Sequence, residues 1–204
     1  MHSNSMKALF LFFTITFVLN ANEWIVRLNK DEIEVQTKKT ALSDVDSFRA
    51  ITIANAPLNQ VLSLIEDPAR SSLWIKYCKE EEVLKIINPN TWIKRTITNM
   101  PWPLADRDSI SKNVKTGSED GKIITIHFDS IANFYPVQEE FVRIELLNGY
   151  WKLEAIDDNK TKVTYEVLTD PKNLPAWLVN TGVVEQPYET LNNLKNIIEK
   201  GDKK

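Results

Sequence analysis

The sequence has little of the material from which most active sites are built. It contains one cysteine, Cys78, and two histidines, His2 and His127. One cysteine cannot form an intramolecular disulfide, and so few thiols and imidazoles leave almost no ligands for a zinc or iron site. Neither a glycine-rich phosphate loop nor a G-x-S-x-G motif occurs. We therefore expect no metal, no cofactor and no catalytic residues.

An excess of basic residues is also absent. Lys and Arg number 25 against 28 Asp and Glu, which gives a formal net charge of −3. Nucleic-acid binding needs a basic surface that neutralises phosphates, so we expect no nucleic-acid partner. With 204 residues, 43% of them hydrophobic, the chain is long enough for one domain with a sizeable core. We expect a single domain over residues 22–204 and a monomer.

Long hydrophobic runs are absent except at the N-terminus. Lys7 precedes an uncharged apolar stretch from Ala8 to Leu19, and the small residue Ala21 follows. This layout is typical of a secretory signal peptide, and the stretch is shorter than the roughly 20 residues that span a bilayer. We predict a signal peptide over residues 1–21 and an exported protein, periplasmic or secreted in a bacterium. An uncleaved membrane anchor and a buried N-terminal element are the alternatives.

Most of the remaining chain alternates apolar and polar residues in short segments separated by turn residues, as half-exposed strands do. The segments with this pattern are 32–39, 47–55, 81–87, 91–98, 105–114, 122–130, 138–147, 150–156 and 161–169. Because the later segments are separated by short turns, we expect hairpins and an antiparallel sheet. Residues 23–30 are expected to form a short helix.

Two segments instead repeat apolar residues at steps of three and four, the period of a helix face. The first begins at Pro57, and the second covers residues 174–200 with Pro187 inside it, where we expect a kink near residues 183–187. One long amphipathic helix can cover the apolar face of a curved sheet. The prediction is therefore an α+β fold, a curved antiparallel sheet wrapped around a long C-terminal helix, with a ligand cavity between them.

The stretch NMPWPLADRDSIS, residues 99–111, brackets Trp102 with two prolines and leads through Asp106, Arg107 and Asp108 into a predicted strand. Alternation along a strand puts Arg107 on one face and both acids on the other. A buried guanidinium requires an acid or a ligand head group, and the preceding predicted strand contains no acid. The alternatives are a solvated turn for the charged triplet and core packing for Trp102.

These segments resemble the START domain, the lipid-transfer module related to the steroidogenic acute regulatory protein. MPWPLADRD at 100–108 resembles the family's strand start with its R-D pair, and Trp74 with Cys78 resembles an earlier W-x(3)-C-like segment. GYWKLEAI at 149–156 and TKVTYEVLTDPKNLPAWLVN at 161–180 resemble two late strands and the passage into the last helix. The resemblance implies a helix-grip fold that binds one hydrophobic ligand in a tunnel, without a cofactor and usually without catalysis.

The resemblance also implies roles for particular residues. It places Arg107 facing the tunnel, an aromatic loop at its mouth, and the start of the last helix along its wall or simply over the sheet. The predicted ligand-binding residues are Arg107, Trp102, Phe134, Tyr135, Trp177, Leu178, Thr181 and Val184. The expected partner is a lipid or another hydrophobic small molecule, and the aromatic loop predicts transient membrane contact.

Two other functions remain open at this point. One is an enzyme of the polyketide cyclase or hydrolase type on the same scaffold, for which only Arg107, Tyr165 and His127 offer candidate acid or base groups. The other is an interaction module that binds no small ligand.

Overall fold

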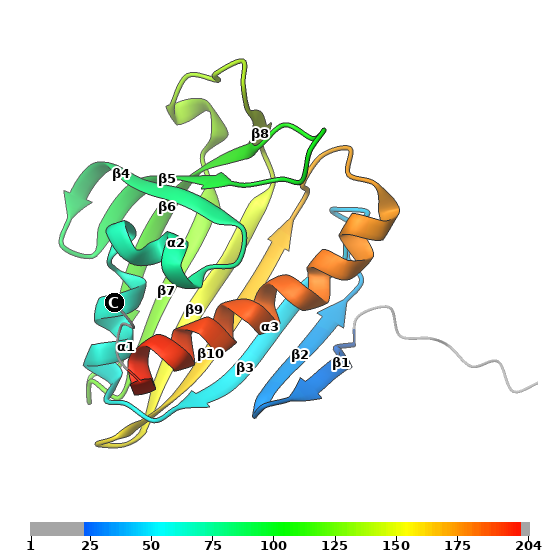
Figure 1. Cartoon of the computed structure of the whole chain (residues 1–204). Coiled ribbons are helices and arrows are strands. Elements are labelled where there is room, and N and C mark those ends of the chain that lie inside the picture. Colours follow the sequence, from blue (N-terminus) through cyan, green and yellow to red (C-terminus); the bar gives the residue numbers. More distant parts are fainter. Residues whose placement is uncertain (1–22, 201–204) are drawn as a thin grey trace, which may run out of the picture.

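The computed structural model describes residues 23–200, without the side chains of Ala176, Trp177 and Asn180. The predicted signal peptide, residues 1–21, lies outside the described residues. Within them, ten strands form one curved sheet around a long C-terminal helix (Figure 1). The predicted α+β helix-grip fold is therefore confirmed. Among the described helices, none combines the length and the hydropathy that a membrane span requires.

The sheet is almost entirely antiparallel. Its strands are β1 (Ile25–Lys30), β2 (Ile33–Lys38), β3 (Ser47–Ala54), β4 (Cys78–Asn88), β5 (Thr91–Thr98), β6 (Arg107–Gly117), β7 (Ile123–Ser130), β8 (Val142–Ile144), β9 (Leu147–Asp157) and β10 (Lys160–Thr169). Their order is β1-β2-β3-β10-β9-β7-β6-β5-β4. The short strand β8 lies off this path and pairs in parallel with β6. Strands β4 to β7 thus form one arm of the sheet, and β1 to β3 form the other.

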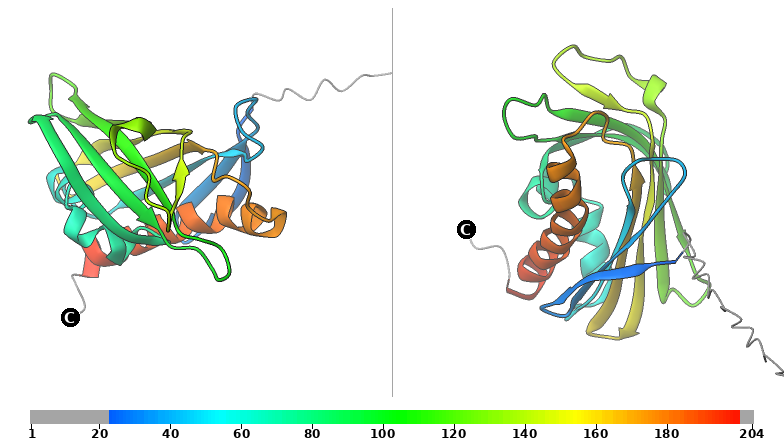
Figure 2. Two further views of the ribbon diagram at one scale, coloured as in Figure 1. Left: turned by 90° about the horizontal axis from the view of Figure 1, so that it is seen from above. Right: turned by 90° about the vertical axis from the view of Figure 1, so that its right-hand side faces the viewer.

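The helices lie on the concave side of the sheet and at one of its ends, and one short 3-10 turn lies in a loop on the outer side. They are α1 (Leu58–Ile65), the 3-10 turn η1 (Pro68–Arg70), α2 (Ser71–Trp74), the 3-10 turn η2 (Ala132–Phe134) and α3 (Ala176–Lys200). Helix α3 packs across β2 and β3 and contacts α2, and Figure 2 shows it inside the curve of the sheet. Pro187 lies inside α3, and the helix continues past it to Lys200.

The core occupies only part of the space between α3 and the sheet. Leu191 and Leu194, on the C-terminal half of α3, are 0% exposed and belong to one cluster with Ile33 and Val35 of β2. Burying such aliphatic side chains contributes about 1.5–3 kcal/mol each. The N-terminal half of α3 faces a different environment, described below.

Gly149 in β9 allows a close approach that any other residue would prevent. A Cβ atom there would lie 2.2 Å from the carbonyl oxygen of Glu166 and 2.6 Å from Cζ of Phe128. The Phe128 ring therefore crosses over β9 at the glycine and reaches the concave side of the sheet.

Two local predictions were wrong. Residues 23–30 form no helix, because Ile25–Lys30 is the edge strand β1 and pairs with β2. Asp31 and Glu32, with φ of 52° and 60°, make the two-residue hairpin turn between them. The predicted strand 138–147 keeps only the three residues of β8 and Leu147, the first residue of β9, because a turn closed by Phe141 and Gln138 occupies its beginning.

Candidate ligand-binding site

A cavity of about 260 Å³ lies between the N-terminal half of α3 and the concave face of the sheet. Its apolar wall comes from β3, β9, β10 and α3 and includes Phe48, Leu147, Trp151, Val167, Leu178 and Val183. The rings of Trp151 and Tyr165 stack there with their centroids 3.8 Å apart.

The opposite wall, formed by β5 and β6, is polar. Its cavity-lining residues are Lys94, Thr96, Thr98, Arg107, Ser109 and Ser111. They alternate with outward-facing residues along each strand, because successive side chains point to opposite sides of a sheet. Glu81 of β4 joins this wall and pairs with Lys94 at 2.6 Å.

Arg107 lies on the cavity wall, only 4% exposed. Its guanidinium donates hydrogen bonds to the carbonyl oxygens of Ala105 (2.5 Å), Pro171 (3.3 Å) and Lys172 (3.1 Å). Burial lowers the pKa of Arg107, and the nearby Asp106 partly opposes this. No acid forms an ion pair with Arg107 among the described residues; three carbonyl oxygens hold its guanidinium instead, and the expected ligand head group stays a prediction. These hydrogen bonds tie the start of β6 to the segment that leads into α3.

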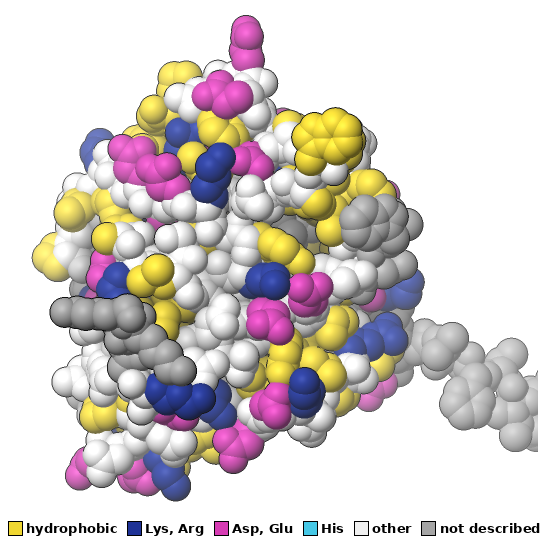
Figure 3. Space-filling model, viewed as in Figure 1, with side chains coloured by type: hydrophobic (Ala, Val, Ile, Leu, Met, Phe, Trp, Pro, Cys, Tyr) yellow, Lys and Arg dark blue, Asp and Glu magenta, His cyan; other side chains and the backbone are white. Residues whose placement is uncertain are grey.

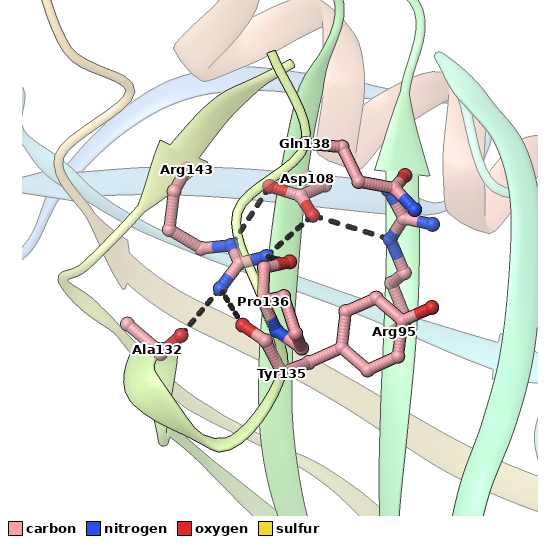
Figure 4. Close-up of polar contacts among 7 residues, drawn as sticks. All are labelled: Arg95, Asp108, Ala132, Tyr135, Pro136, Gln138 and Arg143. Carbon is pink, nitrogen blue, oxygen red and sulfur yellow. Dashed lines mark hydrogen bonds and ion pairs between the residues drawn. The ribbon is translucent and has the colours of Figure 1, made fainter. Parts of the chain in front are cut away.

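Asp108, the next residue, faces the other side of the sheet and is 0% exposed. Arg143 of β8 binds its carboxylate with two hydrogen bonds, of 2.8 and 2.9 Å, and Arg95 of β5 adds a third of 3.2 Å (Figure 4). Two arginines thus surround one acid, and we call Arg95, Asp108 and Arg143 the clamp. Charge-assisted bidentate pairs of this kind are among the strongest hydrogen bonds in proteins.

The clamp holds the loop of residues 131–141 against the outside of the sheet. Arg143 also donates to the carbonyl oxygens of Ala132, Tyr135 and Pro136 (Figure 4). Arg95 donates to Gln138 at 2.7 Å and lies over the rings of Tyr135 and Phe141, with its Cζ 5.5 and 4.8 Å from their centroids. Strand β8 begins only after the turn in which the Phe141 N–H donates to the carbonyl oxygen of Gln138 at 3.1 Å, which accounts for its late start.

The eight predicted ligand-binding residues differ in whether they line the cavity. Arg107 and Leu178 line the cavity, and Val184 packs against the buried core cluster. Thr181 is exposed, and the side chain of Trp177 lies outside the described residues. Trp102 is 92% exposed, so the alternative of core packing for it was wrong.

Phe134 and Tyr135 lie in the loop held by the clamp, and neither lines the cavity. Phe134 is 45% exposed, whereas the Tyr135 ring lies against Arg95. Sequence reasoning missed the clamp and the polar wall. One signal was in the sequence. The segments that form β5 and β8 carry the cations Arg95 and Arg143, and the segment that forms β6 carries the acid Asp108.

Of the three groups considered for an enzyme, Arg107 and Tyr165 both line the cavity, and His127 does not. Tyr165 lines the cavity, and burial raises the pKa of its hydroxyl. His127 is exposed on β7, between Ile126 and Phe128, which are both buried. Cys78 lines the cavity too, but burial and the charge of Glu81 raise the pKa of its thiol to about 12, so it stays protonated at neutral pH. Among the described residues, no group of three or more His, Cys, Asp or Glu could hold a metal ion.

Comparisons with known proteins agree with this architecture. A model of the START domain matches residues 18–197 of the chain. An uncharacterised protein of Pseudomonas aeruginosa is 31% identical over 181 residues, which cover 88% of this chain and 89% of that protein. The solved STAR-related lipid transfer protein of Xanthomonas axonopodis superposes with a TM-score of 0.78 at 25% identity, over 86% of this chain and 98% of that one.

More distant structures share the fold alone. Human STARD10 superposes with a TM-score of 0.76 at 17% identity, over 87% of this chain and 73% of that one. A Streptomyces aromatase/cyclase reaches a TM-score of 0.50 at 10% identity, over 76% of this chain and 93% of that one. With the sheet, the enclosed helix and the family match over most of its length, the chain belongs to the START domain family.

Proposed function

We propose that the protein binds a lipid, or another hydrophobic small molecule with a polar or anionic head group, in the cavity between α3 and the sheet. The observation that carries this proposal is the pairing of an apolar wall with Arg107, a buried cation that forms no ion pair with a carboxylate among the described residues. Ligand pockets are typically apolar with a few well-placed polar groups that orient the ligand. The family relationship supports the same role, since the Xanthomonas relative is named for lipid transfer.

We also propose that the loops around Arg107 contact membranes during loading or release. Three loops, residues 99–106, 131–141 and 170–175, lie at the same end of the molecule (Figure 1). The cavity reaches this end, since Met100, Pro171 and Leu174 line it. At this end, hydrophobic side chains lie exposed among charges of both signs (Figure 3). The exposed apolar residues of the loops include Trp102, Phe134 and Val137, and indole rings favour the membrane interface.

Native mass spectrometry of the purified protein, followed by lipid extraction, tests the binding proposal. We expect a mass above that of the polypeptide, assigned by extraction to a lipid, or uptake of lipid when phospholipids, fatty acids and sterols are offered. A protein that is purified empty and takes up none of these would contradict the proposal.

A signal peptide over residues 1–21 would place this activity outside the cytoplasm, and we propose export on the basis of the N-terminal sequence. Cell fractionation with mass determination of the intact protein tests it. Recovery of a chain beginning near residue 22 in the periplasm or medium supports export with cleavage. A full-length chain in the membrane fraction indicates the anchor instead, and a full-length chain in the cytoplasm contradicts export.

A further inference from the structure

The polar wall of the cavity forms a continuous track along two neighbouring strands. The antiparallel register of β5 and β6 sets its side chains in three cross-strand pairs, Lys94 with Ser111, Thr96 with Ser109, and Thr98 with Arg107. From Arg107 to Ser111 the track covers four residue steps of β6, or about 13 Å. All six residues line the cavity.

The outer end of the track carries a positive charge. Arg107 has five N–H donors, and three carbonyl oxygens among the described residues accept from it. Neutral carbonyls satisfy hydrogen bonds without pairing with the charge of the guanidinium, and the nearby Asp106 forms its ion pair with Lys79 instead. An anionic group in the cavity would supply a counter-ion, and a buried charge that gains a partner is stabilised.

The inner end of the track is different because it is neutral overall. Lys94 donates to Glu81, which also accepts from Ser71 at 2.6 Å and from Thr96 at 3.0 Å. Within the described part of the chain, Glu81 is the one hydrogen-bond partner of the Lys94 ammonium, whose other two N–H groups need acceptors. In this pair the carboxylate of Glu81 accepts and the ammonium of Lys94 donates, as a ligand hydroxyl requires, and the neutral pair does not attract a second anion.

We propose that the ligand is a single-chain amphiphile with two polar ends, a hydroxy fatty acid. This inference rests on the proposed function and specifies its ligand. The carboxylate lies at Arg107 and the far hydroxyl lies between Lys94 and Glu81, while the chain packs on Trp151, Val167 and the α3 side chains. A zigzag chain of roughly ten carbons, with bonds of about 1.5 Å, covers the length of the track. The volume of about 260 Å³ suits one such chain rather than the two chains of a phospholipid.

Isothermal titration of the purified protein with three ten-carbon ligands tests the inference. The ligands are ω-hydroxydecanoic acid, decanoic acid and decanol. We expect the hydroxy acid to bind about tenfold more tightly than decanoic acid, the equivalent of one hydrogen bond. We expect decanol, which lacks the anion, to bind less tightly than the hydroxy acid.

Substitutions in the protein test which end of the ligand binds at each end of the track. The double variant Glu81→Gln/Lys94→Met should abolish the preference for the hydroxy acid and change the affinity for decanoic acid less than about threefold. Arg107→Met should weaken both acids about tenfold or more and leave decanol unchanged. Lys112→Met, on the exposed face of β6, is the matched control and should change none of the affinities.

The unaltered protein alone can overturn the inference, so the test does not depend on whether the variants fold. Equal affinities for the two acids, or binding of phospholipids or sterols but of neither acid, contradict the two-ended ligand and leave the proposed lipid binding intact. If none of the fatty acids, decanol, phospholipids and sterols binds, the proposed function itself fails.

Discussion

Arg107 and Asp108 are neighbours in β6, and both are buried charges, yet the structure compensates them in opposite ways. Asp108 lies outside the sheet, where two arginines neutralise it and form the clamp. Arg107 lies inside, where neutral carbonyl oxygens hold its position without cancelling its charge. Strand alternation puts the two charges on opposite faces of the sheet, the acid among two arginines and the arginine on the cavity wall.

The comparison predicts the largest loss of stability when the acid of the clamp is removed. Asp108→Asn leaves two buried arginines with no counter-charge, which we expect to reduce the free energy of unfolding by about 3–5 kcal/mol. Urea denaturation followed by circular dichroism measures it. Glu119→Gln, in an exposed turn, is the control and should stay within about 0.5 kcal/mol of the unaltered protein. A similarly small loss for Asp108→Asn would show that the clamp contributes little.

Removing one arginine of the clamp should cost less than removing the acid, because the other arginine still pairs with Asp108. We expect Arg143→Met to cost about 3 kcal/mol, since it breaks two bonds to Asp108 and three to loop carbonyls. Arg95→Met should cost about half as much. Hydrogen exchange should rise in residues 131–141 in both variants, and more in Arg143→Met. The reverse order of the two variants would contradict the assignment of Arg143 as the main holder of the loop.

Arg107→Met should cost still less stability, about 1–2 kcal/mol, because it removes an unneutralised buried charge together with its three hydrogen bonds. We expect its main structural effect to be faster hydrogen exchange in residues 170–175. A loss of stability equal to that of Asp108→Asn would show that the two charges are not used differently.

The rate at which Cys78 is alkylated reports on the interior of the cavity, because burial raises the pKa of its thiol to about 12. Only the thiolate reacts with alkylating agents, so iodoacetamide should modify the folded protein much more slowly than free cysteine at pH 8. The rate should rise about tenfold per pH unit up to pH 10 without reaching a plateau. Bound lipid should slow it further. A plateau below pH 9 would mean that the thiol is not in the apolar surroundings of the cavity.

The smallest effect on stability is expected for Trp102→Ala, because the side chain is 92% exposed. The free energy of unfolding should change by less than about 0.5 kcal/mol. Binding to phospholipid vesicles in a sedimentation assay should nevertheless fall several-fold. The exposed Leu42→Ala, outside the three loops, serves as the control, and equal vesicle binding by both variants would remove Trp102 from the membrane contact.

The sequence predicted the face on which Arg107 lies but not what it binds. Alternation is a local property of a strand, so the opposite directions of Arg107 and Asp108 follow from their order, as does the long apolar face of α3. The partners of Arg107 are backbone oxygens of a distant loop, and no side-chain pattern encodes them. The turn at Asp31 and Glu32 was missed for a similar reason, since its positive φ angles are usually signalled by glycine or asparagine.

The polar wall could not be predicted either, because alternation does not say what the polar face of a strand contacts. Lys94 and Thr96 alternate with Ile93 and Arg95, as they would in a strand with one face in water. Whether the polar face meets water or an enclosed cavity depends on where α3 stands relative to β5 and β6. That position is set by the packing of its C-terminal half on β2 and β3, far from these strands in sequence.

A crystal structure with a brominated fatty acid tests the central claim most directly, because anomalous scattering locates the bromine without reference to the protein. We predict that the carboxylate lies within hydrogen-bond distance of Arg107 and that the bromine on the chain lies between α3 and the inner face of β5 and β6. Bromine found only on the outer surface of the sheet, with the cavity filled by water alone, would contradict the account.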